Sequence, residues 1–105
     1  MIYTERLDLL EELGRYLSAA PDDELQQISR KSNVENPWFT IENIRYALDS
    51  IAGDFLDRDR LQHWAAQYPI NSASHPKKTI GLVMAGNIPL VGFHDWLCVF
   101  VAGHR

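Results

Sequence analysis

The sequence TIGLVMAGNIPLVGFHDWLCVFVAGHR, residues 79–105, is the least polar stretch of the chain and decides the fold that we predict. Residues 79–85 form a continuous apolar run without helical or alternating periodicity, which is typical of a short strand buried on both faces. A turn follows in which Pro89 suits the start of a helix, and residues 90–102 are apolar nearly all round until Gly103 provides a stop. A buried strand that leads into a buried helix is the first half of a β-α-β unit, which needs a second parallel strand.

Upstream of this stretch the sequence predicts helices, because apolar residues recur at intervals of three and four. The first helix is expected over residues 4–20, with Thr4 as its N-cap and Pro21 as its stop. A second, shorter helix opens at Pro21 and fades into the polar residues 29–36, so we expect it to be loosely held. The inward stripe of the first helix is predicted to comprise Leu9, Leu10, Leu13, Tyr16 and Leu17.

The third and fourth helices have the clearest boundaries. Thr40 is a suitable N-cap for the third helix, and Gly53 is a natural stop. Asp57 or Asp59 opens the fourth helix, which Pro69 ends. The two helices are predicted to bury Ile41, Ile44, Leu48, Ile51, Phe55, Leu61, Trp64, Ala65 and Tyr68.

These patterns divide the chain into three parts. Residues 1–68 form a helical region, and residues 69–78 form a linker rich in Pro, Ser, Asn and Lys. Residues 79–105 are the truncated first strand, turn and helix of a cofactor-binding domain. We therefore expect a mostly α fold, with about four N-terminal helices followed by one strand and one buried helix.

The composition is that of a globular protein, with 46% hydrophobic and 23% charged residues. A net charge of -4 and scattered Lys and Arg argue against nucleic-acid binding, and the one basic pair, Lys77-Lys78, is better explained as a solvated loop than as a phosphate contact.

The single cysteine excludes an internal disulfide, and the histidines lack the spacing of a zinc site, so no metal is expected. The N-terminus does not resemble a signal peptide, and no apolar run reaches the ~20 residues of a membrane span, so we expect a cytoplasmic location.

Three motifs in the last quarter of the chain carry a family resemblance: Gly81-Leu82-Val83 in the expected strand, Asn87-Ile88-Pro89 in the turn and Ala102-Gly103 at the helix end. With them, residues 80–105 resemble the start of the cofactor-binding domain in acyl-CoA reductases related to the bacterial luminescence (lux) fatty acid reductase, within the aldehyde dehydrogenase superfamily. Residues 39–43 and 64–68 also resemble the N-terminal region of these reductases. His104 departs from the pattern, because the superfamily usually has Asn there.

The resemblance implies an α/β parent fold of the aldehyde dehydrogenase type and an enzyme that reduces an acyl-CoA thioester to an aldehyde with NADH or NADPH. It implies that Asn87 donates its side-chain amide to the thioester oxygen, as one half of an oxyanion hole. It also implies that Met84, Ala85 and Gly86 run beside the nicotinamide ribose. The family's catalytic cysteine, and the lysine that grips the adenosine ribose, fall outside this sequence. We therefore expect an N-terminal portion that is inactive alone and binds no cofactor.

Several of these residues also have a second explanation. Asn87 can instead cap the helix that follows it. Cys98 lies four residues after His94 on one helical face, which is the arrangement of a nucleophile and its base, but its apolar neighbours favour an inert buried thiol. The pair His94-Asp95 either satisfies neighbouring backbone groups at a domain contact or lies near the substrate thioester.

A second class of function also fits the sequence, in which the chain is a small helical interaction module. Its apolar C-terminal helix would then bind a partner or a second copy. Trp38 and Phe39 either pack in the core or line an acyl or partner surface. Under both hypotheses, an apolar strand and helix without cover predict that residues 79–105 either form a homo-oligomer or pack on the preceding helices, out of register with the parent fold.

Overall fold

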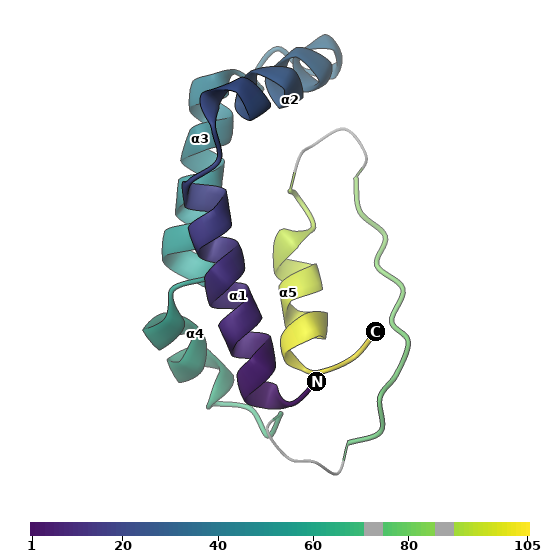
Figure 1. The fold of residues 1–105 in the computed structure, drawn as a ribbon. Helices are drawn as coiled ribbons and strands as arrows, with labels where there is room; N and C mark the ends of the chain where they lie inside the picture. Colours follow the sequence, from purple (N-terminus) through teal and green to yellow (C-terminus); the bar gives the residue numbers. More distant parts are fainter. Residues whose placement is uncertain (71–74, 86–89) are drawn as a thin grey trace.

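All regular structure in the computed structural model is helical within the described residues, which are 1–70, 75–85 and 90–105. The prediction of a mostly α chain is therefore confirmed. The elements are α1 (Tyr3–Ser18), α2 (Asp22–Glu35), α3 (Ile41–Ser50), the π-helical turn η1 (Ile51–Phe55), α4 (Arg58–Ala65) and α5 (Phe93–Val101). Helix α1 contacts α3, η1, α4 and α5, while α2 lies across one end of the molecule beside α3 (Figure 1).

The core consists of two clusters of buried side chains that meet at Leu17, which packs against both. The predicted stripe of α1 is displaced, because Leu9 and Tyr16 are exposed and Leu7 joins Leu10 in the core. The larger cluster joins α1, η1, α4 and α5 through Leu7, Leu10, Ile51, Leu56, Leu61, Ala65, Leu97 and Val101. The smaller cluster joins the end of α1 to α2 and α3 through Ala20, Leu25, Ile44 and Leu48.

Side-chain caps fix two of the helix starts as predicted. The Asn43 backbone N–H donates to Thr40 Oγ1 over 3.2 Å at the start of α3, and the Arg60 N–H donates to Asp57 Oδ1 over 3.0 Å at the start of α4. The prediction for α1 is wrong. This helix begins at Tyr3, ahead of Thr4, because the Ile2 backbone N–H is satisfied by the Glu5 carboxylate over 2.8 Å.

Helix α2 is longer and better held than the sequence indicated. It continues through the polar residues to Glu35, because those residues bond the turn that follows. The Ser29 hydroxyl donates to the Phe39 carbonyl over 2.7 Å, and the Asn33 side-chain amide donates to the Pro37 carbonyl over 3.0 Å. The expectation of a short helix that fades from residue 29 is therefore wrong.

Gly53 is not a helix stop, because the backbone passes through it in the wider π turn of η1. The Leu56 N–H reaches back to the Ile51 carbonyl over 3.2 Å. One extra residue in this turn moves the buried position that follows Ile51 from Phe55 to Leu56. Leu56 is 2% exposed, while Phe55, predicted to be buried, is 39% exposed.

Residues 79–85 are extended, but the predicted strand is not observed among the described residues. A strand needs a partner along its length. Here only the beginning of the segment has one: the Arg105 N–H donates to the Lys78 carbonyl over 2.9 Å, and the Ile80 N–H donates to the Arg105 carbonyl over 2.6 Å. Beyond Ile80 the described residues of the segment form no backbone hydrogen bond, and the segment runs along the margin of the molecule (Figure 1).

The last helix is shorter than predicted. Helix α5 begins at Phe93, because Leu90 has φ 61° and so cannot be part of a right-handed helix. Gly103 has φ 81° directly after the helix, which confirms it as the predicted stop.

The Cα radius of gyration is 15.4 Å, whereas a compact domain of this length has about 13 Å.

The guanidinium of Arg6 connects the first helix to the last. Arg6 is 8% exposed; its Nε donates to the Val101 carbonyl over 3.1 Å and its Nη1 to the Met1 carbonyl over 3.1 Å. The Val101 carbonyl belongs to the last turn of α5, where carbonyl groups lack partners inside the helix and cations are favourable. Gly103 leaves the necessary space, because a side chain there would approach the guanidinium to 3.1 Å.

We expect Arg6→Ala to lower the free energy of unfolding by about 1–3 kcal/mol, because it leaves the buried Val101 carbonyl without its donor. Urea denaturation followed by circular dichroism measures the change. Arg15→Ala is the matched control in the same helix. Arg15 is 72% exposed in its side chain and forms only a 3.6 Å ion pair with Glu11, so this change should stay within about 0.5 kcal/mol. Equal effects of the two substitutions would contradict the assignment.

Gly14→Ala should destabilise the chain by about 1–3 kcal/mol, although alanine is normally the better helix former. A Cβ at this position would lie 2.9 Å from the Leu56 Cβ, so α1 and the end of η1 would have to separate. Gly53→Ala is the control, because a Cβ there meets nothing within 4 Å. Thermal unfolding should show a lower Tm for Gly14→Ala and an unchanged or higher Tm for Gly53→Ala.

Candidate functional site

The described part of the predicted cofactor segment lies next to the start of α5. Met84 packs against Gly92, where a Cβ would come within 2.1 Å of the Met84 sulfur, so only glycine allows this approach. Between this segment and α5 lies a hollow of about 350 Å³. Among the described residues, its lining carries no charged side chain and comprises Met84, Ala85, Leu90, Val91, Gly92, Phe93 and Trp96. Such walls suit an apolar or aromatic group.

Two of the predicted site residues, Gly86 and Asn87, lie outside the described residues. The oxyanion role of Asn87, and its alternative as a helix cap, therefore both stay predictions. Met84 and Ala85 are exposed and border the hollow, but neither one carries a charge or a polar side-chain group that could bind a phosphate, so their cofactor role stays a prediction.

A second site lies between η1, α4 and α5; it centres on His94 and is mostly aromatic and apolar, with the Asp54–Arg60 ion pair at one side. The His94 ring centroid is 5.6 Å from that of Phe55 and 6.4 Å from that of Trp64, and Trp64 in turn meets Tyr68 edge-on at 6.0 Å. Hollows of about 250 Å³ and 450 Å³ lie on either side of the His94–Trp64 contact. No local sequence pattern indicates that these residues meet, because they come from three separate elements.

Cys98 lies beside His94, as the helical spacing predicted. Its Sγ is 3.9 Å from His94 Nδ1 and 4.0 Å from Nε2. Burial, and in second place the Asp95 carboxylate, raise the pKa of the Cys98 thiol, although a hydrogen bond with its own backbone lowers it. A raised pKa keeps the thiol protonated near neutral pH, which is the opposite of what a nucleophilic cysteine needs. Cys98 is only partly buried, so the predicted buried thiol is not observed, but the raised pKa fits the interpretation of Cys98 as an inert thiol.

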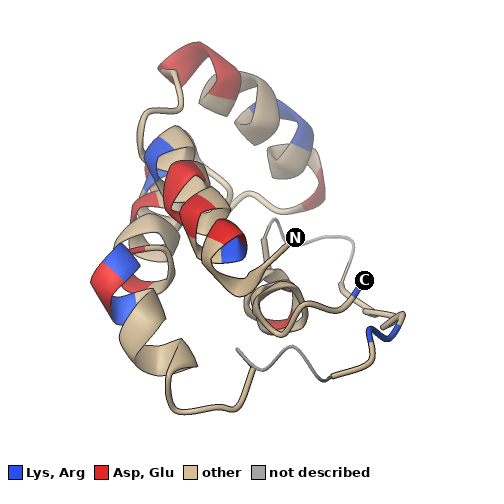
Figure 2. Cartoon of the chain, turned by 60° about the horizontal axis from the view of Figure 1, so that its bottom comes forward, with Lys and Arg blue, Asp and Glu red and all other residues tan. Residues whose placement is uncertain are grey.

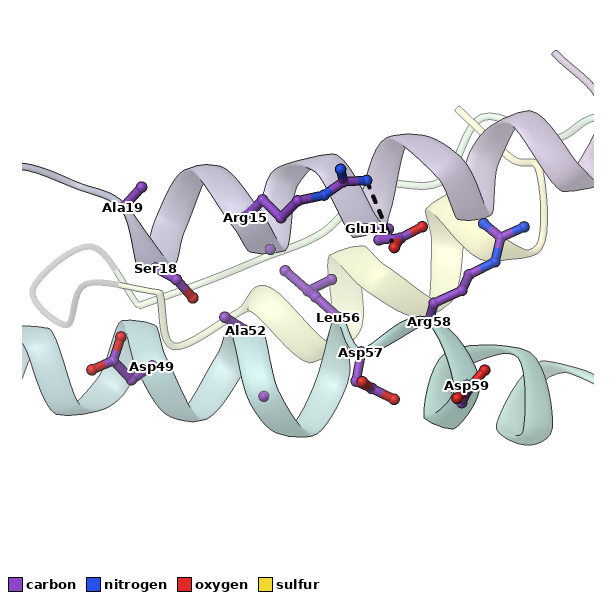
Figure 3. Close-up of a pocket in the computed structure, with 12 residues that line it drawn as sticks. Glu11, Arg15, Ser18, Ala19, Asp49, Ala52, Leu56, Asp57, Arg58 and Asp59 are labelled. Atoms are coloured by element: carbon purple, nitrogen blue, oxygen red, sulfur yellow. Dashed lines mark ion pairs between the residues drawn. The ribbon is translucent and has the colours of Figure 1, made fainter.

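A wider, open groove of about 820 Å³ lies between α1 on one side and α3, η1 and α4 on the other (Figure 3). Small residues such as Gly14, Ala52 and Gly53 leave the space. Several of its charges stabilise the fold itself: Glu11 pairs with Arg15 at 3.6 Å, Arg58 pairs with Asp8 at 2.6 Å, and Asp57 caps α4. The groove is therefore a polar surface groove where these helices meet, and none of its lining residues belongs to the predicted cofactor segment.

The two aromatics of the turn before α3 differ in their surroundings. Trp38 is 78% exposed, so it does not pack in the core, whereas Phe39 packs against the smaller core cluster. Lys77 and Lys78 are exposed on the extended segment, away from the charged residues of the helices (Figure 2). Phe39 thus has the core position that was one of its two explanations, and Trp38 remains available to a partner.

Among the described residues, no group of three or more His, Cys, Asp or Glu gathers as a metal site would require. No helix in the described ranges is long and apolar enough to cross a membrane. Compared with protein-family models, curated proteins and solved structures, the chain matches none of them.

We expect Cys98 to react with iodoacetamide near neutral pH more slowly than in the urea-unfolded chain, and the rate to rise at higher pH. The thiolate is the reactive form, and the raised pKa moves its formation upward. Asp95→Asn should speed the reaction, because it removes the negative charge that, together with burial, raises the pKa of the Cys98 thiol. Mass spectrometry of the alkylated chain measures both rates. A folded chain that reacts faster than the unfolded chain near neutral pH would contradict this account.

Proposed function

We propose that this chain is the N-terminal portion of an NAD(P)H-dependent acyl-CoA reductase that converts an acyl thioester to an aldehyde in the cytoplasm. The chain alone would be inactive. Its share in the enzyme would be the helical N-terminal region and the first extended segment, turn and helix of an α/β cofactor-binding domain.

The hydrogen bonds between Arg105 and the extended segment are the observation that carries the proposal. The Lys78 carbonyl accepts from Arg105, and Arg105 in turn accepts from the Ile80 N–H. Arg105 therefore bonds both neighbours of Thr79, through its N–H to Lys78 and through its C=O to Ile80. This is the hydrogen-bond pattern of a parallel strand pair. The order of extended segment, helix α5 and returning parallel backbone is that of a β-α-β unit, on which nucleotide-binding domains are built.

The hollow beside Met84 gives a second, independent support. In the proposed enzyme, Met84 and Ala85 would line the nicotinamide side of the cofactor, and the apolar walls from Phe93 and Trp96 would exclude water there. NADH or NADPH supplies the hydride when bound. No described residue in this hollow could hold the pyrophosphate, so the chain would contribute only one wall of the cofactor site.

Asn87 would stabilise the oxygen of the acyl thioester by donating its side-chain amide, which is most effective where negative charge develops during the reaction. The nucleophilic cysteine would come from a different part of the enzyme, since the raised pKa of Cys98 makes it unsuitable. His94 and Asp95 would remain at the contact with the helical region.

The test is to follow the reading frame past codon 105 and to assay the longer chain for acyl-CoA-dependent oxidation of NADPH or NADH with release of an aldehyde. The 105-residue chain should give no turnover. In the longer chain, Asn87→Ala should lower kcat by about 10²–10³-fold, while Gln67→Ala in the exposed turn after α4 should leave it unchanged. A stop codon directly after Arg105, or unchanged kcat in Asn87→Ala, would overturn the proposal.

The second candidate function is a helical interaction module that associates with itself or a partner through residues 79–105. The exposed apolar side chains of this region favour it. Val83 is 103% exposed, and Ile80, Met84, Leu90 and Val91 are between 37% and 48% exposed. Apolar side chains grouped in this way mark an interaction surface more often than isolated ones do.

A further inference from the structure

The extended segment 79–85 has two backbone edges, and only one of them is used. In an extended chain the N–H and C=O of one residue point to the same edge, and successive residues point to opposite edges. The Lys78 carbonyl and the Ile80 N–H both face Arg105. The backbone groups of Thr79, Gly81, Val83 and Ala85 therefore face the other edge.

This second edge is open. Within the described part of the chain, the backbone groups of residues 79, 81, 83 and 85 form no hydrogen bond. The segment runs along the margin of the molecule, and no other segment borders the side that faces away from Arg105 (Figure 1). A row of exposed donors and acceptors at regular spacing binds one kind of partner well, which is another extended strand.

We propose that this edge binds the same edge of a second copy in an antiparallel pair, with Leu82 facing Leu82 of the partner subunit across a two-fold axis. In this register Gly81 lies opposite Val83 of the partner subunit and exchanges both backbone hydrogen bonds with it, and Thr79 lies opposite Ala85 of the partner subunit. All of these bonds use the open edge, so the contacts of Arg105 on the other edge remain in place.

The side chains fit this register. Ile80, Leu82 and Met84 share one face of the segment, so the pair would bring two such sets together, with Ile80 beside the partner's Met84. Leu82 is half-buried and belongs to neither core cluster. Directly opposed apolar side chains of this size stabilise a strand pair, and a two-fold axis through Leu82 makes each contact occur twice.

The self-complementary register favours a second copy as the partner, and the charges select the antiparallel direction. Lys77 and Lys78 are exposed at the beginning of the segment. A parallel pair in register would place the two sets of lysines side by side, and directly opposed like charges are unfavourable. The antiparallel pair carries them to opposite ends. This inference deepens the self-association described above, and it does not depend on the reductase proposal.

The first test measures the mass of the 105-residue chain by sedimentation equilibrium. The chain should form a dimer. Leu82→Lys and Leu82→Glu should each weaken the dimer by at least about tenfold in Kd, because each places like charges opposite one another. An equimolar mixture of the two variants should restore a dimer, since Lys then faces Glu. A monomeric wild-type chain, or a mixture that stays monomeric, would overturn the proposal.

The second test fixes the register with disulfides in a Cys98→Ser background. Leu82→Cys should form an intermolecular disulfide on mild oxidation, because facing residues of a pair without mutual backbone bonds have Cα atoms about 4.5 Å apart. Val83→Cys is the control. It faces Gly81 of the partner subunit, and its own copy lies more than about 7 Å away, which is too far for a disulfide. Circular dichroism shows that each variant is folded, and equal cross-linking of both variants would disprove the register.

Discussion

The structure depends on one buried guanidinium. Helix α5 follows a long stretch without regular structure among its described residues, so chain connectivity does little to hold it against the other helices. Leu97 and Val101 bury its apolar face in the larger core cluster, and Arg6 fixes its C-terminal end by donating to the carbonyl of Val101. Burying a charge is costly unless polar partners surround it. Here two carbonyls and the negative end of a helix provide such surroundings without a carboxylate.

The sequence patterns correctly predicted those helix ends that are set by contacts within a few residues. Thr40 and Asp57 cap their helices with bonds to a residue three positions later, and Gly103 ends α5 in a left-handed conformation. Each of these signals lies within one turn of the residue that it affects. The failures have distant causes. The length of α2 depends on the bond from Ser29 to Phe39, and a strand at residues 79–85 depends on a neighbour that composition cannot reveal.

The candidate site was predicted only in part, for the same reason. The sequence indicated Met84 and Ala85 through a resemblance, and the structure places them against an aromatic wall from α5. It did not indicate that Phe55, Trp64 and His94 meet, because these three residues belong to elements separated by up to 39 positions. It did indicate that Cys98 and His94 share a helical face. What decides the chemistry of that pair, however, is the burial and the neighbouring carboxylate that raise the pKa of the thiol.

The π turn η1 decides which side chain enters the core. A regular helix would continue the spacing from Leu48 and Ile51 to Phe55, whereas the wider turn gives the buried position to Leu56 and leaves Phe55 to contact the ring of His94. The aromatic contact between η1 and α5 therefore exists because of a single additional residue in one helical turn. Evolution can create or erase such a site by inserting or deleting one codon, without substituting any of the residues that line it.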